Sequence, residues 1–209
     1  MMSGGKIIPP PHREASLSFA QYLKDYTKRE HAQLEKKLIG MIRSTRSTAQ
    51  YLQLLEMCYG YYHALEAKMD QYLTEEQIPD IAERRKSTAI LKDIQDLGGA
   101  PPAYLPAVPV PAIHSYPQAL GAAYVLEGST LGGMIIAGMI REQLQLSAPE
   151  GFAFFTSYGQ AVQDMWRKFH MYLGALAGET AQQQAAYTAR ETFLKFNEWA
   201  NYYDAVFKV

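Results

Sequence analysis

Apolar and aromatic residues recur every three or four positions through most of the chain, a spacing that predicts amphipathic helices. The first run begins at Ser16, the second follows Ser47 or Thr48, either of which can cap a helix, and the third begins at Pro79 and ends at Gly98. The apolar faces of the first two expected helices comprise Phe19, Tyr22, Leu23, Tyr26, His31, Leu34 and Leu38, and then Tyr51, Leu54, Leu55, Cys58, Tyr62, Leu65, Met69 and Tyr72.

Six prolines fall within residues 100–117, and this density predicts a stiff loop because proline interrupts helices. Further helices are expected over about 117–144, 152–176 and 179–206, and no strand-like alternation of convincing length occurs. The expected fold class is therefore all-α, with about five to seven helices packed as one multi-helix bundle.

Composition agrees with a single globular domain, expected over residues 16–209 after a flexible N-terminal tail at residues 1–15. The chain has 209 residues, 48% of them hydrophobic, and a net charge of −1. This balance gives no indication of binding to nucleic acid or to a membrane surface. Cys58 is the only cysteine, so no intrachain disulfide forms. Without an apolar signal sequence at its start, the protein is expected to be cytoplasmic.

The segment LEGSTLGGMIIAG, residues 126–138, places four glycines in an otherwise helical apolar stretch. Each glycine in a helix interior costs about 1 kcal/mol relative to alanine, so a close approach must require them. A phosphate loop is not indicated, because no Gly-Lys-Ser/Thr follows. Close helix packing and a flat ligand lying on the backbone both explain the pattern, and packing is the simpler explanation from these residues alone.

His31 shares a predicted helix face with Leu23, Thr27 and Leu34, so it is expected to point toward the interior. Glu35 follows one turn later and is placed to accept the Nδ1 proton, which leaves Nε2 for a metal. This arrangement suits a single axial ligand of a haem iron, although an ordinary i,i+4 surface pair fits the same spacing. The other histidines form no metal-ligand pair.

Taken together, these segments resemble the haem oxygenase family, specifically its bacterial, biliverdin-producing branch. Leu23-x3-Thr27-x3-His31-x2-Leu34-Glu35 is similar to the proximal helix of the family, and residues 124–133 are similar to its distal helix. Residues 84–98 are similar to the helix between these two, and residues 158–169 are similar to a later helix, so the resemblance covers about residues 16–206.

This resemblance implies a haem-oxygenase-like fold and O2-dependent, reductive cleavage of haem b at a meso carbon to biliverdin, CO and Fe2+. Haem is then both cofactor and substrate. It implies that His31 is the axial ligand, oriented by Glu35. The haem would lie against Gly128, Gly132 and Gly133, where missing side chains leave room for O2 on the iron.

The resemblance also assigns supporting roles around this expected haem site. Lys24 and Arg167 fall where the family holds the propionates, and Phe193 falls where an aromatic residue lines the pocket. Thr27 and Tyr124 accompany the proximal and distal helices. Ser129 stands where mammalian relatives carry an aspartate that anchors the distal water, so the expected catalytic segment is Gly128, Ser129 and Gly132.

An external electron donor is implied, either a ferredoxin, a flavodoxin or an NAD(P)H-dependent reductase, and the family is usually monomeric. The product would serve iron acquisition or supply a bacterial phytochrome. Two alternatives stay open: a haem-binding or haem-shuttling protein without catalysis, and a haem-free helical relative. For the last, Cys58 and Glu127 are the only candidate cavity residues.

Overall fold

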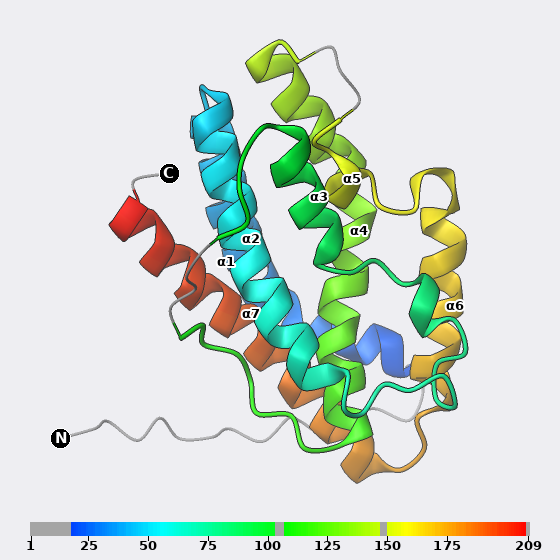
Figure 1. The fold of residues 1–209 in the computed structure, drawn as a ribbon. Helices are drawn as coiled ribbons and strands as arrows, with labels where there is room; N and C mark the ends of the chain where they lie inside the picture. Colours follow the sequence, from blue (N-terminus) through cyan, green and yellow to red (C-terminus); the bar gives the residue numbers. More distant parts are fainter. Residues whose placement is uncertain (1–17, 103–106, 147–149, 208–209) are drawn as a thin grey trace, which may run out of the picture.

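The computed structural model describes residues 18–102, 107–146 and 150–207, and within these ranges the chain is helical without strands (Figure 1). The expected all-α class is therefore confirmed, whereas the tail expected at residues 1–15 lies outside the described ranges. The helices are α1 (Phe19–Ser44), α2 (Thr48–Met69), α3 (Thr88–Asp96), α4 (Tyr116–Leu144), α5 (Ala153–Thr156), α6 (Val162–Ala175) and α7 (Glu179–Phe207), with short 3-10 turns at Ile81–Glu83 and Gly159–Ala161.

Serine caps begin the first two helices. The Ser18 hydroxyl accepts a hydrogen bond from the Gln21 amide, and the Ser47 hydroxyl accepts one from the Gln50 amide. These bonds satisfy amides that have no partner in the first turn of a helix. The predicted cap at Ser47 is therefore confirmed.

The third expected helix is much shorter than predicted. Only Thr88–Asp96 is α-helical, because the backbone at Arg84 is extended, with φ −70° and ψ 142°. The side chain of Arg84 is buried between two carboxylates at this break, which fixes the chain in a non-helical path. The predicted stop is confirmed: Gly98 follows the helix at φ +78°, a conformation that favours glycine.

The helix expected over about 152–176 is also divided. Ser157 and Gly159 have φ angles of 45° and 54°, which turn the chain between α5 and α6. Left-handed residues of this kind interrupt an α-helix, and no periodicity of apolar residues reveals them.

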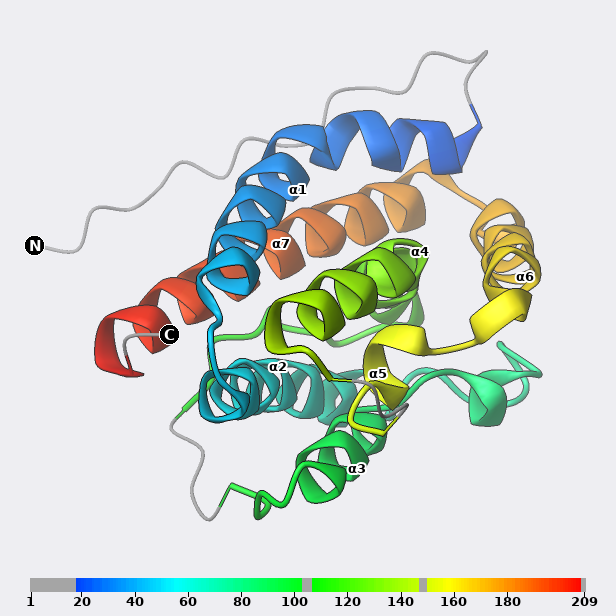
Figure 2. The ribbon, with the colours of Figure 1, turned by 90° about the horizontal axis from the view of Figure 1, so that it is seen from above.

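Helix α4 forms the centre of the bundle and α7 packs along it. Viewed from above, α7 passes between α1 and α4, and α6 stands across one end of this group (Figure 2). A Cβ added at Gly121 would lie 2.0 Å from the carbonyl oxygen of Ala185, so the absence of a side chain lets α4 and α7 cross closely. By length and composition alone α4 could cross a membrane, but it packs against α2, α5, α6 and α7 as a core helix does.

Candidate functional site

The histidine of α1 lies at the edge of the core rather than inside it. The neighbouring turns bury Leu23, Thr27 and Leu34, whereas the side chain of His31 is exposed. This corrects the expectation that it points inward. Its ring meets the buried Phe193 of α7 edge-on, with centroids 5.4 Å apart and an angle of 67° between the planes. The imidazole is therefore accessible to a ligand while one edge rests on the core.

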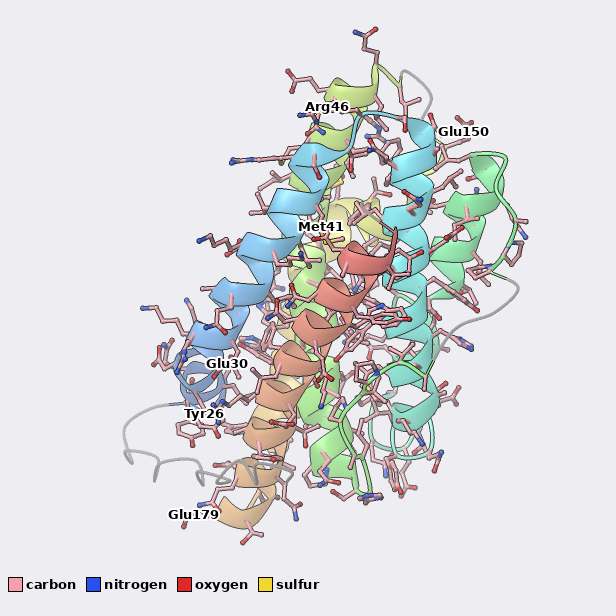
Figure 3. All side chains as sticks on the ribbon, turned by 90° about the vertical axis from the view of Figure 1, so that its left-hand side faces the viewer. Tyr26, Glu30, Met41, Arg46, Glu150 and Glu179 are labelled. Carbon is pink, nitrogen blue, oxygen red and sulfur yellow. The ribbon has the colours of Figure 1, made fainter. Side chains whose placement is uncertain are left out.

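Glu35 does not accept a hydrogen bond from His31 in the described part of the chain, which corrects the expected pairing. Both side chains are exposed, where a long carboxylate gains little from a fixed partner. The carboxylate that is held near the histidine is Glu30, which is buried and paired with Arg190 of α7 at 2.8 Å. Figure 3 shows Glu30 on the side of α1 along which α7 passes. No periodic pattern of residues indicated this pair.

The glycines of α4 meet different neighbours. A Cβ at Gly133 would lie 2.0 Å from the carbonyl oxygen of Phe155, so α5 accounts for this glycine through close packing, as the simpler sequence alternative proposed. A Cβ at Gly128 would lie 3.5 Å from the Trp166 ring. Gly132 has nothing within 4 Å of that position, so no contact inside the described chain accounts for its missing side chain.

An apolar surface surrounds Gly132. Leu131, Met134 and Ile135 are 38%, 52% and 70% exposed, although α4 is otherwise a core helix. Three large apolar side chains within five residues of one helix form a patch of the kind that marks a binding surface. We refer to Leu131, Gly132, Met134 and Ile135 as the open face of α4.

Faces of α1 and α4 meet at Thr27 and Tyr124. Burial raises the pKa of Tyr124, and a hydrogen bond with the Thr27 hydroxyl opposes that rise. Followed along the chain, both helices run upward in Figure 1. One turn further along, α1 presents His31 and α4 presents Gly128, because residues four apart share a helix face. The histidine and the glycine segment therefore lie on the two faces that meet at this contact.

Trp166, which was not expected at the site, and the expected site residues Lys24 and Arg167 have different placements. Trp166 packs against Tyr124 with ring centroids 5.7 Å apart and closes this end of the site from α6. Lys24 is exposed on α1. Arg167 is exposed and forms an ion pair with Asp164 at 2.8 Å, so its present partner is on its own helix.

Ser129 is turned toward α2 and the 84–87 segment. Its hydroxyl contacts the Tyr62 hydroxyl at 2.9 Å and the Arg85 guanidinium at 2.7 Å. It also donates to the Leu126 carbonyl oxygen at 2.7 Å. These contacts occupy the hydroxyl, and the expected catalytic role of Ser129 stays a prediction.

A buried polar cluster, which the sequence did not reveal, surrounds Arg84. Arg84 forms ion pairs with Asp80 at 2.8 Å and with Glu127 at 2.6 Å, and it also donates to the Met165 carbonyl oxygen. Burial and the neighbouring Glu127 raise the pKa of Tyr158 to about 12, so its hydroxyl stays protonated and donates to Glu127. The one available signal was an acidic residue, Glu127, within the most apolar helix.

Fold and site together define an all-helical protein. Its histidine lies on α1, its glycine segment lies on α4, and α7 packs against both helices. The sequence model of the family described as Heme oxygenase matches residues 17–202. The chain therefore belongs to the haem oxygenase family.

Solved structures agree on the fold. A heme oxygenase from Neisseria meningitidis, studied with bound NO and CO, is similar with a TM-score of 0.76 and 22% identity, covering 91% of this chain and 94% of that one. A heme oxygenase from Leptospira interrogans is similar with a TM-score of 0.72 and 19% identity, covering 89% of this chain and 100% of that one. No curated protein sequence matches the chain.

Proposed function

We propose that the protein binds haem between α1 and α4, with His31 as the iron ligand, and cleaves it with O2 and external electrons to biliverdin, CO and Fe2+. The observation that carries the proposal is the open face of α4. Gly132 has no neighbour that requires a glycine, and the large apolar side chains around it are exposed although the adjacent Thr130, Gly133 and Ala137 of α4 are buried. A flat apolar ligand explains both features.

The residues present fit a haem. His31 offers an accessible imidazole whose edge rests on Phe193, so the ring direction is limited before any ligand binds. A neutral imidazole of this kind is a common axial ligand of haem iron. Leu131, Met134 and Ile135 supply apolar surface for the porphyrin, and their burial would contribute about 25 cal/mol for each Å² removed from water.

Charged groups near the opening fit the propionates. Lys24 precedes His31 by two turns on α1, and its exposed ammonium has freedom to reach a carboxylate. Arg167 would exchange Asp164 for a propionate, since both members of that pair are exposed and hold each other weakly.

When bound, haem supplies the iron that activates O2 and the meso carbon that is oxidised. The protein contributes the geometry. Gly128 and Gly132 leave space on the α4 side at their two positions, and Trp166 and Tyr124 close one end of the site. Electrons are proposed to arrive from a ferredoxin, a flavodoxin or an NAD(P)H-dependent reductase.

The test adds one equivalent of hemin to the purified protein and follows the Soret band. Reductant is then added in air with catalase present, so that free peroxide does not degrade the haem. Loss of the Soret band together with the broad red absorbance of biliverdin is expected. A stable Soret band would instead indicate a haem carrier, and the absence of any sharp Soret band would contradict haem binding.

A further inference from the structure

Arg85 lies behind the glycine-bearing turn of α4. Its Nη2 donates to the Ser129 hydroxyl and to the Leu126 carbonyl oxygen, both at 2.7 Å. The guanidinium stacks over the rings of Phe154 and Tyr62, at 4.4 and 5.1 Å from their centroids. Two hydrogen bonds and two ring faces therefore fix the position of this group against α4.

These contacts fall on a turn of α4 that has unusual hydrogen bonding. Ser129 donates to the Leu126 carbonyl oxygen, and Thr130 donates to that of Glu127, both at 2.7 Å. Hydroxyls that bond back to carbonyls of the preceding turn tend to bend a helix. The upper half of α4 leans away from the direction of its lower half (Figure 1). Arg85 adds a third donor to this turn and so supports the bend.

The two neighbouring arginines differ in their charge balance. Arg84 pairs with two carboxylates, Asp80 and Glu127, and only 3% of its side chain is exposed, so these three groups together carry one negative charge. Arg85 forms no ion pair with any carboxylate among the described residues. Its positive charge therefore has no carboxylate in direct contact and lies on the back of the turn that carries Gly128 on its front.

We propose that Arg85 is a positioning residue for α4: it holds Ser129 and the Leu126 carbonyl, and so sets both the bend of the haem-facing turn and the electrostatic potential there. The proposal rests on the proposed function for its effect on haem, but not for its effect on the helix. It also assigns Ser129 an indirect role, as the group through which Arg85 acts.

The first test measures amide hydrogen exchange across residues 125–133 in the haem-free protein. Arg85→Met removes the donors and is expected to raise exchange at least about tenfold in this segment, because local opening becomes easier. Arg43→Met, an exposed arginine at the end of α1, is the matched control and is expected to change nothing in α4. Equal exchange in wild type and Arg85→Met would overturn the positioning role.

The second test titrates the absorption spectrum of the ferric haem complex with pH, following the loss of a proton from the water bound to the iron. A nearby positive charge favours the deprotonated form, so Arg85→Met is expected to raise the midpoint by at least about half a pH unit. Arg85→Lys keeps the charge and is expected to leave the midpoint within about 0.2 unit of wild type. A midpoint unchanged in Arg85→Met would overturn the electrostatic part.

The titratable side chains packed around Arg85 do not interfere with this titration. Burial raises the pKa of the Cys58 thiol of α2 to about 12, and Tyr158 has a similar value. Burial also raises the pKa of Tyr62, although Arg85 and Ser129 oppose the rise. Glu127 from α4 is paired with Arg84. A midpoint change between about pH 7 and 10 is therefore not assigned to these groups.

Ser129→Ala, made in both backgrounds, tests the connection. It is expected to raise the midpoint when Arg85 is present and to have no effect in Arg85→Met. Equal effects in both backgrounds would overturn the indirect role of Ser129. If the wild type gives no Soret band, the proposed function fails, and hydrogen exchange alone still decides the positioning of α4.

Discussion

The ring of His31 on α1 rests edge-on against the ring of Phe193 on α7, with centroids 5.4 Å apart. From the sequence, Glu35, four residues away, was expected to orient this histidine. The structure instead supplies an aromatic neighbour from a helix that is distant in sequence. The direction of the imidazole is thus a property of the packing of α1 on α7.

Removing the imidazole should separate haem binding from folding. His31→Ala is expected to abolish the sharp Soret band, whereas the free energy of unfolding should change by less than about 0.5 kcal/mol because the side chain is exposed. His63→Ala is the matched control, since His63 is also exposed and stacks on Tyr59 in α2. A normal Soret band in His31→Ala would reassign the ligand.

Gly132 and Gly133 are adjacent but should respond in opposite directions. Gly132→Ala should raise the free energy of unfolding by about 0.5–1 kcal/mol, because alanine is the better helix former and has space. Gly133→Ala should lower it by about 1–3 kcal/mol or more, because the new methyl group meets the Phe155 carbonyl. Urea unfolding measures both, and equal signs would contradict the assignment.

A larger side chain at position 132 tests the site itself. Gly132→Leu should preserve the fold, because the space is open, yet fill the surface on which haem is proposed to lie. Hemin titration and product chromatography are expected to show weakened binding or lost turnover. Full activity with an unaltered product would show that haem does not approach this turn.

The Glu30–Arg190 pair should contribute measurably to the attachment of α1. Arg190→Met leaves a carboxylate that is only 6% exposed without its partner, and a loss of about 1–3 kcal/mol in the free energy of unfolding is expected. Lys195→Met breaks the more exposed pair with Glu198 and is expected to cost less than about 0.5 kcal/mol. Comparable losses would show that burial of Glu30 is unimportant.

His170 gives a stability that depends on pH. Its Nε2 is buried without a hydrogen-bond partner in the described structure, and burial lowers the pKa of the ring below 6.5. The unfolded chain therefore binds a proton more readily, so stability is present above pH 6.5 and is lost as the pH falls toward the lower folded value. Relative to His170→Phe, wild type should lose stability between pH 7.5 and 5.5, and a constant difference would contradict this.

Periodicity was sufficient to predict the main helices, because apolar residues recur every three or four positions along α1, α2, α4 and α7, and Ser47 marks the start of α2. It failed at Arg84, where contacts with distant segments decide the backbone, and at Ser157, whose left-handed φ of 45° gives no apolar signal. Apolar spacing carries no information about an ion pair to Glu127 forty-three residues away.

The candidate site could be predicted from the sequence to a similar extent. Local motifs indicated His31 and the glycine segment as candidate site residues, and the family resemblance assigned both to one haem site. The same motifs did not distinguish Gly133, which serves helix packing, from Gly132, which has open space. They also did not reveal the contacts of Ser129, because its partners Arg85 and Tyr62 come from other elements.

The close crossings at Gly121 and Gly133 have a mechanical consequence. Backbone from α7 and from α5 touches α4 at these two points, twelve residues and so about 18 Å apart along the axis. A helix that is held at two such points can bend between them, but it cannot shift along its axis or rotate about it. The turn at Gly128 lies inside that span, so the register of α4 against α5 and α7 is held on both sides of this turn.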